Sequence, residues 1–222
     1  MNRRPMIIFS GAVVGAMTVL SAWAWTQLPA GAQVPIHWGL DGRVDGYAPR
    51  EIGVFLLPLL TAGIAALLAV IPRFEPRRAN LERSGKAYAA IWIAVVSLLG
   101  TVHVLSVAVA LGAVLDVSRL ILIGVGLLLF VIGNYLPTVR PNYLMGIRTP
   151  WTLASDLSWV RTHRVGGRIF VIEGLALIAL GLVGAGTGML AVAVLGTLAI
   201  ELIVIVVYSY RVWKVDPEKR QA

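Results

Sequence analysis

Residues 88–110 read YAAIWIAVVSLLGTVHVLSVAVA, a stretch of 23 residues without a single aspartate, glutamate, lysine or arginine. An α-helix rises about 1.5 Å per residue, so this stretch would form a helix about 34 Å long. The hydrocarbon core of a bilayer is about 30 Å thick. The stretch therefore predicts a helix that crosses a membrane.

Five further apolar stretches predict membrane-spanning helices, at residues 5–25, 52–71, 117–136, 169–185 and 189–210. Nearly all other residues belong to the connections between these spans. We therefore expect one all-α integral membrane domain over residues 1–222, built as a bundle of six transmembrane helices.

The composition agrees with a membrane protein and excludes several other classes. The chain is 58% hydrophobic and only 14% charged, whereas roughly a quarter of the residues in a soluble domain are charged. A soluble enzyme, a disordered chain and a coiled coil are therefore excluded. The absence of cysteine also excludes disulfides, thiolate metal ligands and cysteine nucleophiles.

The basic residues predict how the chain is oriented. Of the 19 lysines and arginines, 16 fall at the two termini and in the connections after the second and fourth spans, and only Arg43, Arg50 and Arg119 fall on the opposite side. Lysine and arginine are enriched on the cytoplasmic side of membranes. The distribution predicts a bacterial inner-membrane protein with both termini in the cytoplasm, so the net charge of +8 does not indicate direct nucleic-acid binding.

The first apolar stretch has a rival interpretation as a cleaved signal peptide. Arg3 and Arg4 precede it, and Ala22-Trp23-Ala24 resembles a cleavage site. The apolar stretch is longer than the core of such peptides. Trp23 and Trp25 fit better as an aromatic anchor at the membrane interface, which favours a retained helix.

The loop between the first two spans, residues 26–51, predicts a small extracytoplasmic β-ribbon. Val34, Ile36, Trp38 and Leu40 alternate with other residues at the period of a half-buried strand, and two Asp-Gly pairs follow as tight turns. The candidate residues for an external ligand or partner are Pro35, His37, Trp38, Asp41, Asp45 and Tyr47. His37 with the two aspartates could instead bind a cation, but turn chemistry with one solvated histidine is the favoured explanation.

The connection of residues 137–168 predicts a cytoplasmic amphipathic helix between spans four and five. Three prolines exclude a helix in its first half, and from Thr152 an apolar face begins that ends at Gly166-Gly167. Such a helix would lie on the membrane surface and either anchor the fifth span or receive a partner. The candidate residues for the partner surface are Asn134, Asn142, Arg148, Thr149, Trp151, Trp159, His163 and Arg164.

Both loops resemble those of a known family. The segments NYLP at 134–137, RPNY at 140–143 and GIRTPWTL at 146–153, followed by Trp159 and THR at 162–164, resemble the signature of the SdpI-type membrane proteins. The outer loop resembles the short domain that precedes this signature in the longer members. The resemblance implies a six-helix membrane protein that confers immunity against a secreted toxic peptide. The type member of the family also sequesters a soluble repressor at the membrane, and the resemblance implies this second activity as well.

Three ionisable side chains fall inside the predicted spans: His103, Glu173 and Glu201. A charge at bilayer depth costs about 2.5–3.5 kcal/mol on insertion scales, so each is expected to face the bundle interior. Interhelical hydrogen bonding is the favoured role, and a proton path that joins His103 to Glu201 is the alternative. Glu173 is expected to pair with Arg168 or Arg148.

No catalytic residue, cofactor or metal is expected, because the three histidines lie at three different depths and no nucleophile elbow or phosphate loop is present. The small-residue pairs Gly11/Gly15, Gly181/Ala185 and Gly184/Gly188 indicate close helix packing within the chain. The favoured function is a non-enzymatic immunity protein with membrane lipid, a toxic peptide and a repressor as partners. The two alternatives are a proton-coupled transporter and a membrane-embedded enzyme acting on lipid or peptide.

Overall fold

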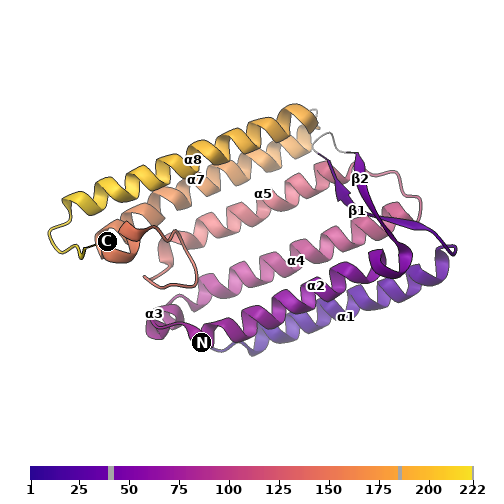
Figure 1. Ribbon diagram of the computed structural model, residues 1–222, viewed down its shortest axis with the longest axis horizontal. Coiled ribbons are helices and arrows are strands. Elements are labelled where there is room, and N and C mark those ends of the chain that lie inside the picture. The colour runs from indigo at the N-terminus through magenta and orange to yellow at the C-terminus, as the bar shows by residue number, and fades with distance from the viewer. Residues whose placement is uncertain (40–42, 185–186, 222) are drawn as a thin grey trace.

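The computed structural model describes residues 1–39, 43–184 and 187–221, without the side chains of residues 187–195. Six long helices dominate it (Figure 1). They are α1 (Arg4–Gln27), α2 (Arg50–Val70), α4 (Gly85–Ala110), α5 (Val117–Tyr135), α7 (Asp156–Val183) and α8 (Thr187–Val215). Shorter elements connect them: the strands β1 (Gln33–Trp38) and β2 (Val44–Pro49), the 3-10 turns η1 (Ile71–Phe74) and η2 (Leu136–Thr138), and the helices α3 (Arg78–Arg83) and α6 (Pro150–Ala154).

The lengths of the helices confirm a multi-pass membrane bundle. Over the described residues, α1, α2 with η1, α4, α5 with η2, and α7 are long and apolar enough to cross a membrane. The sixth long helix, α8, extends over 29 residues. The predicted set of spans is thus found, with several helices longer than their apolar stretches.

The six helices lie side by side, with the strands at one end of the bundle and both chain termini at the other (Figure 1). We call these the ribbon end and the terminal end. Contacts divide the helices into two groups of three. One group is α1, α2 and α4, and the other is α5, α7 and α8; α4 and α5 pack against each other and join the groups.

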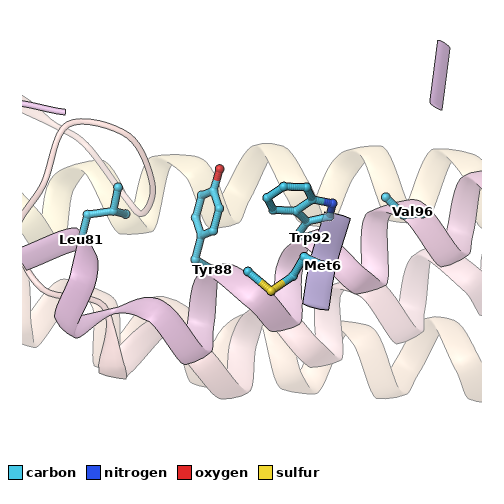
Figure 2. Packing of buried hydrophobic residues seen from close by; sticks show 5 residues of the cluster. All are labelled: Met6, Leu81, Tyr88, Trp92 and Val96. Atoms are coloured by element: carbon cyan, nitrogen blue, oxygen red, sulfur yellow. The ribbon is translucent and has the colours of Figure 1, made fainter. Parts of the chain in front are cut away.

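Buried side chains at the terminal end hold the first group together. Met6 of α1, Leu81 of α3, and Tyr88, Trp92 and Val96 of α4 form a cluster that is closed to solvent (Figure 2). The polar atoms of its aromatic rings are satisfied, because Trp92 Nε1 donates to a serine hydroxyl of α1 at 2.8 Å and the Tyr88 hydroxyl donates to a carbonyl of α2 at 2.6 Å. A buried tryptophan or tyrosine needs such a partner.

Helix α7 differs from the predicted boundaries. Ser155 caps it by accepting a hydrogen bond from the Ser158 N–H at 2.8 Å. However, the helix continues without a break through Gly166-Gly167, which we expected to end it. The short helix α6 is therefore the separate element between α5 and α7, and the predicted surface helix forms one rod with the fifth span.

Close packing against α5 explains why glycine occurs inside α7. A Cβ atom added to Gly167 would lie 2.7 Å from the Gly133 carbonyl oxygen, and one added to Gly174 would lie 2.6 Å from the Gly126 carbonyl oxygen. Real Cβ atoms essentially never come so close to a neighbour. The glycines let two antiparallel helices approach backbone to backbone, the small-residue packing common in membranes. They are contact sites and do not end the helix.

Candidate functional site

The β-ribbon at the ribbon end is confirmed and is fastened to the helices. Strands β1 and β2 pair antiparallel. Val34 of β1 is fully buried with Val54 of α2 and Val107 of α4. The Ser106 hydroxyl of α4 donates to the Pro35 carbonyl at 2.6 Å. The ribbon therefore rests on the ends of α2 and α4.

The strict alternation predicted for β1 is not kept. Val34 and Pro35 are both buried, and Ile36, expected on the buried face, is 41% exposed. The pairing register shifts on both sides of His37. Such irregularities rotate the following side chains relative to the regular pleat. As a result, Ile36, His37 and Tyr47 are exposed, whereas Trp38 is half-buried.

His37 and Asp45 meet on the exposed surface of the ribbon. Their Nδ1 and Oδ1 atoms are 2.5 Å apart, and the side chains are 70% and 52% exposed. The third member of the suggested cation site, Asp41, lies outside the described residues. Among the described residues, no three histidine, aspartate or glutamate side chains gather as metal ligands. A solvent-exposed pair of this kind contributes little to stability.

At the terminal end, Glu75 fixes the connection of residues 136–149. Its carboxylate is buried and accepts the Tyr143 N–H at 3.1 Å and the Arg77 N–H at 2.9 Å. Asn142 is fully buried; its side-chain oxygen accepts the N–H groups of Leu144 and Met145, both at 2.8 Å. These bonds satisfy backbone groups that a proline-rich loop leaves without secondary-structure partners.

His163 closes the same connection from α7. Its Nε2 accepts the Ile147 N–H at 3.0 Å, and its Nδ1 faces the Trp159 carbonyl at 2.8 Å. Since a carbonyl only accepts, Nδ1 carries the proton and the ring is neutral. The ring stacks on Trp159, with centroids 4.1 Å apart, and Trp159 Nε1 donates to the Val139 carbonyl at 2.8 Å. Gly146, at φ +113°, lies against the imidazole, so that an added Cβ would collide with Nε2.

A buried polar cluster attaches the end of α8 to the start of α7. Ser209 bonds Thr149 at 3.0 Å through their hydroxyls, and its carbonyl accepts the Ser158 hydroxyl at 2.8 Å. The Ser155 hydroxyl donates to Asp216 at 2.5 Å. This bond, with one from the Glu218 N–H, holds the pKa of the Asp216 carboxyl below its ordinary value.

The residues suggested for a partner surface divide into two sets. Asn142, Thr149, Trp159 and His163 are buried and hold the connection in shape. Asn134, Arg148 and Arg164 are exposed, and Trp151 is half-buried in edge contact with Tyr210 at 5.2 Å. The structure thus leaves Asn134, Arg148 and Arg164 accessible.

Sequence reasoning missed Glu75, Ser209 and Asp216. Each bonds a group about 60 residues or more away in the chain. Glu75 can be recognised in the sequence as an acidic residue within an arginine-rich connection, but no local pattern indicates its partner.

Within the spans, His103 makes the interhelical hydrogen bonds that we favoured, whereas its alternative contact with Glu201 is not found among the described residues. His103 is fully buried and bonds α1, at 3.1 Å from the Met17 carbonyl and 3.2 Å from the Ser21 hydroxyl. Glu201 of α8 instead interacts with Glu173 of α7. Glu173 does not bond the expected arginine, because neither of its own carboxylate oxygens receives a hydrogen bond from a described residue.

Helix geometry explains the missing arginine partner. Arg168 lies five residues before Glu173, which places it about 140° around the helix axis. Arg168 is exposed while Glu173 is buried. Arg148 is exposed too and donates to the Tyr143 carbonyl.

Two family models match the chain. Residues 138–209 match the SdpI/YfhL protein family, and residues 12–62 match a domain of unknown function, DUF1648. The chain is also similar to the immunity protein SdpI of Bacillus subtilis (strain 168), with 23% identity over 181 residues, covering 80% of this chain and 83% of the relative. No solved structure matches.

These matches coincide with the architecture described above. The first covers the connection fixed by His163 and Asn142, together with α7 and most of α8. The second covers most of α1, the ribbon and the first half of α2. These similarities support an SdpI-type family for this multi-pass membrane protein.

Proposed function

We propose that this protein is a non-enzymatic immunity protein of the bacterial inner membrane, which protects its cell against a secreted toxic peptide. The observation that carries the proposal is the similarity to the immunity protein SdpI, because it extends over four-fifths of this chain and includes both ends of the bundle.

The proposal places the ribbon outside the cell and both termini in the cytoplasm. The termini lie together at the end opposite to the ribbon (Figure 1). The connections that carry most of the lysines and arginines lie at that same end. Positive residues favour the cytoplasmic side, so the ribbon end faces outward. Residues 26–51 then form the outer loop and residues 137–168 the inner connection of one membrane domain.

The outward surface of the ribbon would meet the toxic peptide. Tyr47 is 56% exposed and Ile36 is 41% exposed, beside the exposed pair of His37 and Asp45. An exposed aromatic and aliphatic pair flanked by charge suits an amphipathic peptide. Because the ribbon is fastened to α2 and α4, a peptide bound here would act on the ends of both helices.

A protection assay tests the function. We would express the protein in sensitive bacteria, verify membrane insertion, and follow the membrane potential during challenge with purified secreted toxic peptides, with the Bacillus relative as the positive control. We expect protection by the wild type and its loss in Tyr47→Ala. The matched control is Phe74→Ala, an aromatic residue that is 76% exposed at the terminal end. Depolarisation equal to that of cells without the protein would refute the proposal.

The inner surface would relay the toxic peptide to a soluble repressor. Asn134, Arg148 and Arg164 are the exposed members of the signature there. We expect Arg148→Ala to abolish the transcriptional response to challenge while protection persists. Arg83→Ala, an exposed arginine at the same end, is the control and should leave the response intact. An unchanged response in Arg148→Ala would remove this residue from the relay.

A further inference from the structure

Two carboxyl groups lie next to each other between α7 and α8. Glu173 is 6% exposed and Glu201 is half-buried. The two carboxyl groups lie within reach of each other, yet both oxygens of Glu173 and Oε2 of Glu201 are buried and receive no hydrogen bond from any donor that the structure describes. Buried polar atoms are nearly always hydrogen-bonded, so three unsatisfied oxygens at one place require an explanation.

Among the residues that the structure describes, no basic side chain compensates for this pair. The titratable residues of α5 are Arg119 and Tyr135, which lie near its two ends. Arg119 donates to the carbonyls of Gly181 and Leu182, two or more helical turns beyond Glu173. On α7, Arg168 is exposed and turned away.

On α8, Glu201 stands well inside the helix. The nearest basic residue on that helix is Arg211, about 15 Å further along the axis, and Tyr208 and Tyr210 precede it.

The other titratable residues of α7 are Asp156, Arg161, His163 and Arg164, all closer to the terminal end than Arg168.

Two ionised carboxylates cannot occupy such a position together. Transfer of one carboxylate out of water is strongly unfavourable unless it is paired, and a second negative charge beside it adds repulsion. Neighbouring carboxyl groups in other proteins resolve this conflict by sharing a proton.

We propose that Glu173 and Glu201 form a proton-binding site within the membrane. One carboxyl carries the proton and donates it to an oxygen of the other through a small rotation of the side chains. This hydrogen bond satisfies buried oxygens that the protein otherwise leaves unpaired. When the proton leaves, the two negative charges repel each other across the contact between α7 and α8.

The release of the proton would then affect one end of the helix pair more than the other. The terminal end of α8 is attached to α6 and α7 through Ser209 and Asp216. Repulsion at Glu201 therefore separates the helices on the side that faces the ribbon end. The packing of α5, α7 and α8 then depends on whether the Glu173–Glu201 site holds its proton.

Labelling with the apolar reagent dicyclohexylcarbodiimide tests the site, because the reagent reacts with protonated carboxyl groups in apolar surroundings. The purified full-length protein, reconstituted in phosphatidylcholine vesicles, is labelled near pH 7 and analysed by mass spectrometry of its peptides. We expect the label on Glu173 or Glu201, with loss of labelling as the pH rises. The exposed Glu82 and Glu218 serve as internal controls and should stay unlabelled. No label on either buried residue at any pH would overturn the proposal.

Single substitutions test whether the two groups share the proton. In Glu201→Gln the amide donates to the remaining carboxylate, and like-charge repulsion is gone. We therefore expect Glu173 in this variant to lose its label at the pH at which the wild type is labelled. Glu173→Gln gives the reciprocal test on Glu201 if the first variant does not fold. Labelling with an unchanged rate and pH profile in a folded variant would show that the groups are independent.

Replacement of choline chloride by sodium chloride at equal ionic strength identifies the occupant. A proton site should label equally in both salts. Protection by sodium would show a metal-cation site and would overturn the assignment of a proton.

Discussion

Gly133 of α5 and Gly167 of α7 face each other so closely that a Cβ on either one would lie 2.7 Å from the carbonyl oxygen of the other. The contact repeats one heptad along, at Gly126 and Gly174. Residues seven apart lie on nearly the same face of a helix, so these glycines form a continuous line of backbone contact. The pair of α5 and α7 is the most closely packed part of the group formed by α5, α7 and α8.

Substitution of Gly167 by alanine should therefore destabilise the protein. The added methyl group collides with backbone, which cannot rotate away as a side chain can, and overpacking of this kind costs about 1–3 kcal/mol. Thermal unfolding in detergent micelles measures the effect. Gly15→Ala in α1 is the control, because nothing lies within 4 Å of its added Cβ. Equal melting temperatures for the two variants would contradict the close contact.

Gly146→Ala should destabilise the connection of residues 136–149. The backbone at φ +113° disfavours a side chain, and the new methyl group would collide with the His163 ring. We expect a loss of stability of about 2 kcal/mol or more. Gly31→Ala separates the two causes, since Gly31 has φ +82° but open space around it. Equal losses of stability in Gly146→Ala and Gly31→Ala would contradict the collision with the His163 ring.

The bond between Ser155 and Asp216 should make stability dependent on pH. The pKa of the folded Asp216 carboxyl lies below its unfolded value, so its contribution is present above the unfolded pKa and is lost as the pH falls through the folded pKa. Asp216→Asn should therefore lose stability at neutral pH but show less acid sensitivity below about pH 4 than the wild type. Urea unfolding at several pH values measures this. Parallel pH profiles for the two proteins would contradict the assignment.

The absence of cysteine allows a direct test of orientation. Tyr47→Cys and Lys219→Cys each introduce one exposed thiol into a chain that has none, at the ribbon and in the tail. We expect a membrane-impermeant maleimide to label Tyr47→Cys in intact cells and Lys219→Cys only after permeabilisation. The reverse pattern would show that the termini face outward.

The membrane architecture was predictable because its causes are local. Apolar length determines a span, and the Asp41-Gly42 pair with the alternation before it indicates a hairpin. Both features can be recognised within a short window of sequence. The ribbon and the spans were found for this reason. The second pair, Asp45-Gly46, was expected to form a turn but lies within strand β2.

The errors arose where a residue acts on a distant partner. Gly166-Gly167 has the local pattern of a helix end, but the requirement for glycine at position 167 comes from Gly133 of α5, more than 30 residues earlier. His163 has the pattern of an accessible histidine in a basic loop, but Ile147 and Trp159 enclose it. Likewise, the neighbour of Glu173 depends on how α8 packs against α7. Such pairings require the fold.

The division into two groups of three helices has a consequence for how the polypeptide could be made. Residues 111–116 join the groups at the ribbon end and include Val114, which is fully exposed. Each half would contain three long helices of its own. The contact between α4 and α5, together with the bonds that Glu75 and Ser84 make to the second half, would hold the halves together. A gene divided at this connection should yield two polypeptides that insert independently and reassemble into one working protein.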